Sequence, residues 1–201
     1  MPDPEWMPAA FAAIDTANTL DPNEIEIDGR SLPKEWVHAQ QASSWLERLA
    51  PDASSALRLA VRAHHLERWR RPRDAYEKNR PGYLRWRRDA QRFHAERMRA
   101  LVGGLGVPEA TLDRAEALIC KARPGDDTHR REAQHFEDAL CLVFLEWQLA
   151  DFATTVSPDK LRAILTKTLP KMSAAAVELA AALPLPPEHR ALLLELAAPR
   201  S

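Results

Sequence analysis

The scarcity of glycine and of strand-forming patterns constrains this chain more than any other feature of its sequence. Only six glycines occur in 201 residues, and no alternating run of β-branched residues extends beyond the short Glu24-Ile25-Glu26-Ile27. Alanine, leucine and arginine are abundant, and these residues favour helix. A chain of this length can bury the core of one domain. The sequence therefore predicts an all-α fold, with residues 1–201 forming a single domain.

Proline, glycine and aspartate positions divide the chain into the expected helices. These cover about residues 8–18, 34–49, 53–69, 83–102, 108–123, 131–152 and 157–169, with a terminal pair around 184–187. Pro72 and Pro81-Gly82 bracket a strongly basic connection that we expect to be irregular. The helical periods predict a bundle whose apolar stripes face a common core.

Charge and cysteine usage limit the classes of function. A formal net charge of −1 argues against a general binder of nucleic acids or membrane surfaces. Cys120 and Cys141 lie in apolar helical stretches, which is typical of free thiols in a reducing compartment. The first five residues carry two acids and no basic residue, unlike a signal peptide, and no apolar run is long enough for a membrane span. We expect a cytoplasmic protein that does not bind membranes, and a homodimer is compatible with the sequence.

Histidines on several expected helices suggest a shared metal site. His64 follows Leu57, Ala60 and Val61 at helical spacing, so its side chain is expected to face the core. Imidazole and carboxylate ligands suit Zn, Mn or Fe, and ligands from different helices can converge inside a bundle. The alternative is that each histidine is a hydrogen-bonded core residue and the carboxylate an acid at a helix N-terminus. We predict one divalent metal ion (Zn, Mn or Fe) held by His38, His64, His94 and Asp138.

The remaining histidines are expected at the surface. His189 is isolated near the C-terminus, and His129 and His135 neighbour a polar loop rich in glycine and aspartate.

The order of these residues resembles that of the HD-domain metalloproteins, a superfamily named for a His-Asp dipeptide on a core helix. His38, Ala63-His64-His65-Leu66, Phe93-His94-Ala95-Glu96 and Glu137-Asp138 stand where that superfamily has its successive ligands. The resemblance spans about residues 33–150 and implies an HD-like helical bundle, followed by a helical extension at about 157–198. It also implies a metal centre in the bundle.

A narrower resemblance joins three further stretches to a family described only as domain of unknown function 4202. These stretches are Ile14-Asp15-x-Ala17-Asn18, Pro33-Lys34-Glu35-Trp36-x-His38-Ala39-Gln40 and Glu137-Asp138-x-x-Cys141-Leu142-Val143-Phe144-Leu145-Glu146. That family brings no established activity with it.

Two departures from the HD pattern shape the expected metal content. His65 replaces the aspartate that bridges two ions in dinuclear members, and Lys121 stands where a further histidine would fall. Both changes favour one ion. Adjacent helical residues lie about 100° apart, so we predict that His64 is the ligand while His65 exchanges protons from an outer position. Lys121 lies either near the position that the missing histidine would occupy, or in solvent at a helix C-terminus, where a positive charge is favourable.

The segment between His65 and His94 combines arginines with aromatic residues. Guanidinium groups match phosphate geometry and aromatic faces can stack a base, so we expect a nucleotide or another phosphorylated small molecule, with RNA as an alternative partner. A solvated loop whose arginines pair with Asp74, Glu77 and Asp89 would also explain the composition. The expected contacts are Arg68, Arg80, Lys34, Trp69 and Tyr83.

These patterns together favour a metal-dependent phosphohydrolase acting on a nucleotide or small phosphorylated metabolite. The expected catalytic groups are Glu67 or Glu137 as base, His65 as proton carrier and Lys121 as a charge that stabilises the transition state. One alternative is a degenerate HD module that binds nucleotide or RNA without catalysis. The other is an HD-type di-iron oxygenase, which the missing bridging aspartate disfavours.

Overall fold

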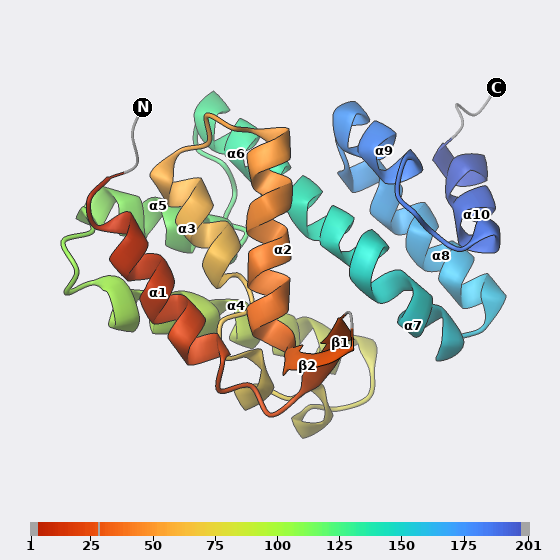
Figure 1. Cartoon of the computed structure of the whole chain (residues 1–201), viewed down its shortest axis with the longest axis horizontal. Coiled ribbons are helices and arrows are strands. Elements are labelled where there is room, and N and C mark those ends of the chain that lie inside the picture. Colours follow the sequence, from red (N-terminus) through yellow and green to blue (C-terminus); the bar gives the residue numbers. More distant parts are fainter. Residues whose placement is uncertain (1–3, 28, 198–201) are drawn as a thin grey trace.

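Helices form nearly all the regular structure of the computed structural model, which describes residues 4–27 and 29–197 (Figure 1). Ten α-helices and one two-stranded sheet occur within these residues, which confirms the all-α prediction. Buried apolar side chains from Ala10 to Leu193 belong to a connected hydrophobic core. Within the described residues, no helix combines the length and apolar character that crossing a bilayer requires.

A short hairpin connects the first two helices. Helix α1 (Met7–Asn18) is followed by strands β1 (Glu24–Ile27) and β2 (Arg30–Pro33), which pair antiparallel. The alternating run seen in the sequence is thus a strand. Helix α2 (Lys34–Leu49) has the predicted bounds, and Asp21 accepts a hydrogen bond from the backbone amide of Glu35 at its start (3.0 Å). Helix α3 (Ser55–Ala63) packs against α1 and α2.

The middle of the chain completes the bundle around α2. Helices α4 (Arg80–Val102), α5 (Glu109–Ile119) and α6 (Asp127–Val143) are followed by a π-helical segment, Phe144–Gln148, and by α7 (Leu149–Thr154). Trp45 donates a hydrogen bond to Glu146 (2.8 Å), while Ser54 bonds Glu132. These two contacts show that α2 runs antiparallel to α6 and the π-helical segment.

Three C-terminal helices lie together on one side of the molecule (Figure 1). They are α8 (Pro158–Thr168), α9 (Ala174–Ala181) and α10 (Pro187–Ala197). Helix α10 contacts both α8 and α9, and α9 also packs on α6.

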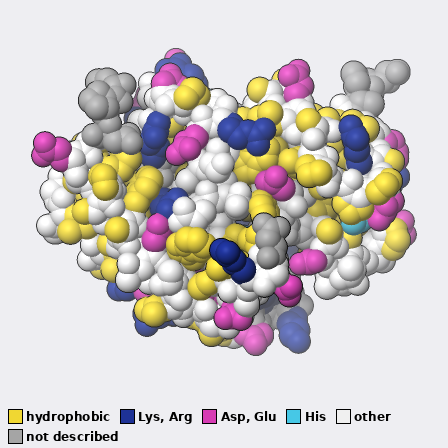
Figure 2. Space-filling view, in the orientation of Figure 1, with side chains coloured by type: hydrophobic (Ala, Val, Ile, Leu, Met, Phe, Trp, Pro, Cys, Tyr) yellow, Lys and Arg dark blue, Asp and Glu magenta, His cyan; other side chains and the backbone are white. Residues whose placement is uncertain are grey.

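Figure 2 shows basic and acidic side chains interspersed on one face of the molecule, with only a small area of histidine visible there.

One expected helix is shorter than its sequence pattern indicated. The interval expected to be helical at 53–69 contains α3, which ends at Ala63. His64 to Glu67 then form a turn, and Arg68–Arg70 form one 3₁₀ turn. Glu67 adopts left-handed backbone (φ 52°), which a continuing α-helix cannot contain. The expected helix at 131–152 also differs, because it begins at Asp127 and changes to π-helix at Phe144.

Candidate metal centre and anion-binding pocket

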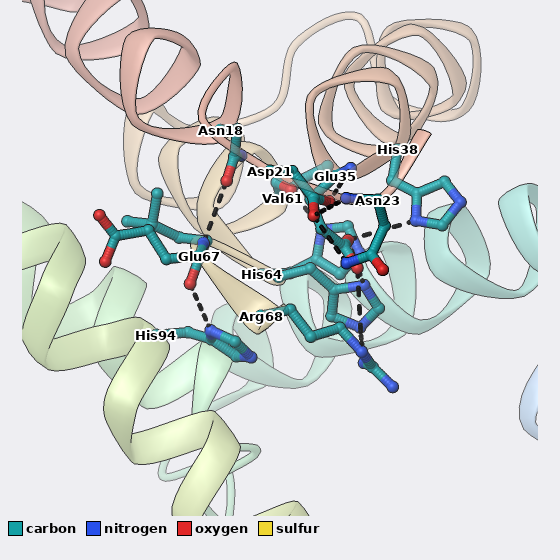
Figure 3. A network of polar contacts seen from close by, with 12 residues as sticks. Asn18, Asp21, Asn23, Glu35, His38, Val61, His64, Glu67, Arg68 and His94 are labelled. Atoms are coloured by element: carbon teal, nitrogen blue, oxygen red, sulfur yellow. Dashed lines mark hydrogen bonds and ion pairs between the residues drawn. The ribbon is translucent and has the colours of Figure 1, made fainter. Parts of the chain in front are cut away.

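The fold brings four histidines from different elements together. His38 comes from α2, His64 and His65 from the turn after α3, and His94 from α4. The ring centroid of His65 lies 4.1 Å from that of His64, 6.3 Å from that of His38 and 6.0 Å from that of His94. Figure 3 shows His38 and His94 approaching from opposite sides, with His64 between them. The expected convergence of His38, His64 and His94 is therefore present, with His65 at its centre.

Glu35 is a member of this cluster that the sequence reasoning missed. Its Oε2 lies 3.2 Å from His38 Nδ1 and 3.3 Å from His65 Nδ1. Burial opposes ionisation of Glu35, but its contacts with His65 and His38 hold the pKa of the carboxyl well below its usual value. One ligand atom from each of the three residues lies within 4.8 Å of the others. The i, i+3 spacing of Glu35 and His38 on one helix was the available signal.

His64 and His94 each present one free ring nitrogen. The Nδ1 of His64 bonds the carbonyl of Val61 (2.8 Å), and that of His94 bonds the carbonyl of Leu66 (2.7 Å; Figure 3). A backbone carbonyl only accepts, so both Nδ1 atoms carry the proton and both Nε2 atoms keep a lone pair. Burial lowers the pKa of His64 to about 3 and that of His94 to about 4. Both imidazoles are therefore neutral at physiological pH, the form that binds metals or accepts protons.

His65 is also neutral. Its Nε2 lies 2.6 Å from Nη1 of Arg68. A guanidinium group only donates, so His65 Nε2 accepts and its Nδ1 carries the proton beside Glu35. Burial lowers the pKa of His65 well below its usual value, and the positive charge of Arg68 adds to this shift. The guanidinium of Arg68 also lies over the ring of Trp86 at 5.0 Å, which holds Arg68 at the edge of the cluster.

The structure does not support the roles predicted for the two adjacent histidines, with His64 as the metal ligand and His65 outside the ligand shell. His64 was predicted as the ligand because of its position on a helical stripe, but α3 ends before it. His65, predicted to lie outside the ligand shell, is the histidine grouped with Glu35 and His38.

A pocket of about 260 Å³ adjoins the histidines and is strongly cationic. His64, His65 and His94 form part of its wall. The other walls carry the basic side chains Arg68, Arg87, Lys121 and Lys171, and the aromatic side chains Tyr83 and Trp86. Arg68, Tyr83 and Lys121 were singled out from the sequence. Lys171, in the C-terminal helices, had no local signal, because only the tertiary fold brings it here.

Asp138 does not belong to this site. Its Oδ1 accepts hydrogen bonds from the backbone amide of Ser173 (2.8 Å) and from the side chain of Gln134 (2.9 Å). Phe136 and Leu140 line the pocket, and Asp138, two residues from each, faces the opposite side of α6.

The packing of α2 on α6 also separates Asp138 from His38. His38 lies beside Trp147 and Gln148 in a second pocket of about 290 Å³. Asp138 is ten residues before Gln148, or roughly 15 Å along a helix. The predicted sharing of one ion by His38 and Asp138 therefore conflicts with this geometry.

The other expected catalytic groups are engaged by partners. Arg97 donates to both carboxylate oxygens of Glu67 (2.8 and 3.0 Å), so Glu67 has a fixed partner in place of a reacting water. Lys121 and Glu137 form an ion pair with each other at the pocket edge. Neither carboxylate is a free base in this arrangement.

The remaining expected contacts lie away from the pocket wall. Lys34 borders the second pocket beside His38, Trp69 is half-buried in the 3₁₀ turn, and Arg80 lines a neighbouring groove on α4. His129 is buried, in contrast to the surface position expected for it.

Comparison with known proteins identifies one family. The model of a domain of unknown function (DUF4202) matches residues 8–193 of the chain, which include every residue of the histidine cluster and the pocket. No curated protein and no solved structure matches the chain.

Proposed function

This chain belongs to the DUF4202 family, a domain of unknown function, and we propose that it is a metal-dependent phosphohydrolase acting on a nucleotide or small phosphorylated metabolite. One observation carries this proposal. Neutral histidines with free ring nitrogens share a pocket with four basic side chains, Arg68, Arg87, Lys121 and Lys171. Candidate ligands for a metal ion and for a phosphate group would thus lie side by side.

Glu35, His38 and His65 would hold one divalent metal ion, with His64 and His94 beside it; to bind the ion, His65 would give up its Nδ1 proton or the hydrogen bond from Arg68. One observation supports this fit: one ligand atom from each of these three residues already lies within 4.8 Å of the others. Beside them, Nε2 of His94 is buried without a hydrogen-bond partner. Carboxylate and imidazole ligands suit Zn, Mn or Fe. When bound, such an ion acidifies water and polarises a phosphoryl oxygen.

The basic side chains would bind the phosphoryl group and oppose its developing negative charge. Arg68 stands nearest to the cluster, because it touches both His65 and Glu35 (3.9 Å from Nε to Oε1). Lys121 and Lys171 approach from the other side of the pocket, from the end of α5 and the C-terminal helices. A phosphate seated between them would be contacted from two sides.

His94 is the proposed proton acceptor. It is neutral, its Nε2 is unpartnered, and its ring lines the pocket. The hydrogen bond from Nδ1 to the Leu66 carbonyl fixes the ring, so Nε2 can take a proton from a water without a change of tautomer.

We also propose that the histidine-bearing helices are a divergent HD-like core in a cytoplasmic protein. The order of His38, His64-His65 and His94 supports this relation, whereas the position of Asp138 departs from it. Among the described residues, a single group of three potential ligands is present, which favours one ion over a di-iron site. The free thiols of Cys120 and Cys141 accord with a reducing compartment.

Elemental analysis combined with phosphatase assays tests the proposal. We expect about one equivalent of Zn, Mn or Fe in the purified chain, and metal-stimulated hydrolysis of p-nitrophenyl phosphate or nucleoside monophosphates. Glu35→Gln and His38→Ala should lose most of the bound metal and the activity, because each removes a ligand. His189→Ala, on α10, is the matched histidine control and should retain both.

The result that removes the proposal is a wild-type chain without metal whose activity no added ion restores. Binding of nucleotides by such a chain would identify the non-catalytic module instead.

A further inference from the structure

An arginine-lined groove runs along α4 beside the histidine pocket. Its volume is about 620 Å³, and its walls are Arg80, Pro81, Leu84, Arg85, Arg87, Arg88 and Gln91. Arg80, Leu84, Arg87 and Gln91 follow one another at helical spacing, so they share a face of the helix. Eleven residues separate the first from the last, which corresponds to roughly 16 Å.

No ion pair involves the arginines of this groove among the residues that the structure describes. Within the described part of the chain, Arg80, Arg85, Arg87 and Arg88 form no ion pair, whereas Arg97 pairs with Glu67 and Arg99 with three acids. Like charges at neighbouring positions of a helix repel one another. An anion bound in the groove would reduce this repulsion. Because the whole chain has a net charge of −1, the positive potential produced by these arginines is confined to the groove.

The groove is continuous with the proposed phosphohydrolase pocket. Arg87 and Gln91 line both of them. The pocket alone, at about 260 Å³, is smaller than the roughly 300 Å³ lower limit of ordinary small-molecule sites. A ligand whose phosphate enters the pocket therefore extends along α4 if it is larger than a small monophosphate.

An aromatic side chain stands at the junction. Tyr83 is 43% exposed, although it lines the pocket, and its ring lies 5.8 Å from that of Trp86. The guanidinium of Arg87 lies 5.8 Å from the centre of the same ring. An exposed ring between phosphate-binding arginines can stack a base, a contact that bare polyphosphate cannot make.

We propose that the α4 groove binds the phosphodiester backbone of a short single-stranded oligonucleotide whose end enters the histidine pocket. Arg80, Arg87 and Arg88 neutralise successive phosphates, and Tyr83 stacks a base at the pocket mouth. Only the role of the pocket end rests on the proposed phosphohydrolase function; binding in the groove does not require catalysis.

Fluorescence anisotropy with a labelled hexaribonucleotide tests the groove. Three neutralised phosphates predict a slope of about −2 for log K against log salt, because each contributes about 0.7 on single strands. Arg80→Ala and Arg88→Ala should each weaken binding several-fold and reduce the slope by about 0.7. Arg130→Ala, which removes the same charge from an exposed position on α6, should leave binding unchanged.

Two results would overturn the proposal. In the first, Arg80→Ala and Arg88→Ala bind the oligonucleotide as well as Arg130→Ala does. In the second, inorganic polyphosphate competes as strongly as unlabelled RNA and Tyr83→Ala has no effect, which identifies a bare polyanion site. If the chain hydrolyses monophosphates but its RNA binding does not depend on the groove arginines, only the proposal for the groove is rejected. If RNA binds in the groove but no phosphate ester is hydrolysed, only the proposed phosphohydrolase function is rejected.

Discussion

Glu67 shapes the histidine turn although it lies outside the proposed ligand set. Its left-handed backbone (φ 52°) ends the turn, and its amide donates to Oδ1 of Asn18 on α1 (3.0 Å; Figure 3). Arg97 holds its carboxylate from α4. The preceding carbonyl, of Leu66, is thereby directed at His94. The orientation of a site histidine thus depends on residues that touch neither metal nor substrate.

Asn18→Ala should destabilise the fold by about 1–3 kcal/mol, because it leaves the buried amide of Glu67 without an acceptor. Urea unfolding measures this change. Asn23→Ala is the comparison, since the exposed Asn23 side chain donates a single hydrogen bond, to Asp21 (2.8 Å), whose loss should cost less than about 1 kcal/mol. Equal unfolding free energies for the two variants would show that Asn18 does not anchor the turn.

At the scale of elements, Asp138 attaches the C-terminal helices to α6. It accepts from the amide of Ser173, the residue that caps α9, and Gln134 bridges it to the carbonyl of Lys171. Asp138→Ala should therefore increase hydrogen exchange in residues 158–197 while metal content stays at the wild-type level. Asp52→Ala, at an exposed position, should change neither measurement. Loss of metal in Asp138→Ala with unchanged exchange would restore the ligand assignment made from the sequence.

Local signals predicted elements better than they predicted contacts between them. Helix α2 has the expected bounds because a proline and a proline-aspartate pair delimit it. The end of α3 was missed, since the turn that follows it is held by a hydrogen bond from the Glu67 amide to Asn18, 49 residues away. The histidine cluster was predictable because each imidazole sits on or beside an apolar stripe. Asp138 was misplaced because the packing register of α2 and α6 depends on pairs such as Trp45 and Glu146.

At the scale of the whole molecule, the buried neutral histidines make stability depend on pH. The unfolded chain protonates histidine near pH 6.5, whereas burial lowers the pKa of His64 to about 3 and of His94 to about 4 in the fold. Between these values the unfolded state binds more protons, so the free energy of unfolding falls with acidification. The stabilisation is complete above about pH 6.5 and is lost as the pH falls toward 4.

Lowering the pH from 7.5 to 5 should therefore cost about 2 kcal/mol for each of these histidines, or about 4 kcal/mol for the pair. Urea unfolding in the presence of a chelator measures this without contribution from a metal. His94→Gln cannot be protonated in this range, so it should lose the roughly 2 kcal/mol that His94 contributes to the pH dependence, even if it is less stable at every pH. His64 and His65, whose pKa values are also lowered, keep their contributions. His189→Gln, a substitution at the C-terminal helix α10, should leave the dependence intact. A wild-type stability that is flat from pH 7.5 to 5 would mean that the histidines are accessible to water, and the closed, neutral cluster from which the metal centre is inferred would not exist.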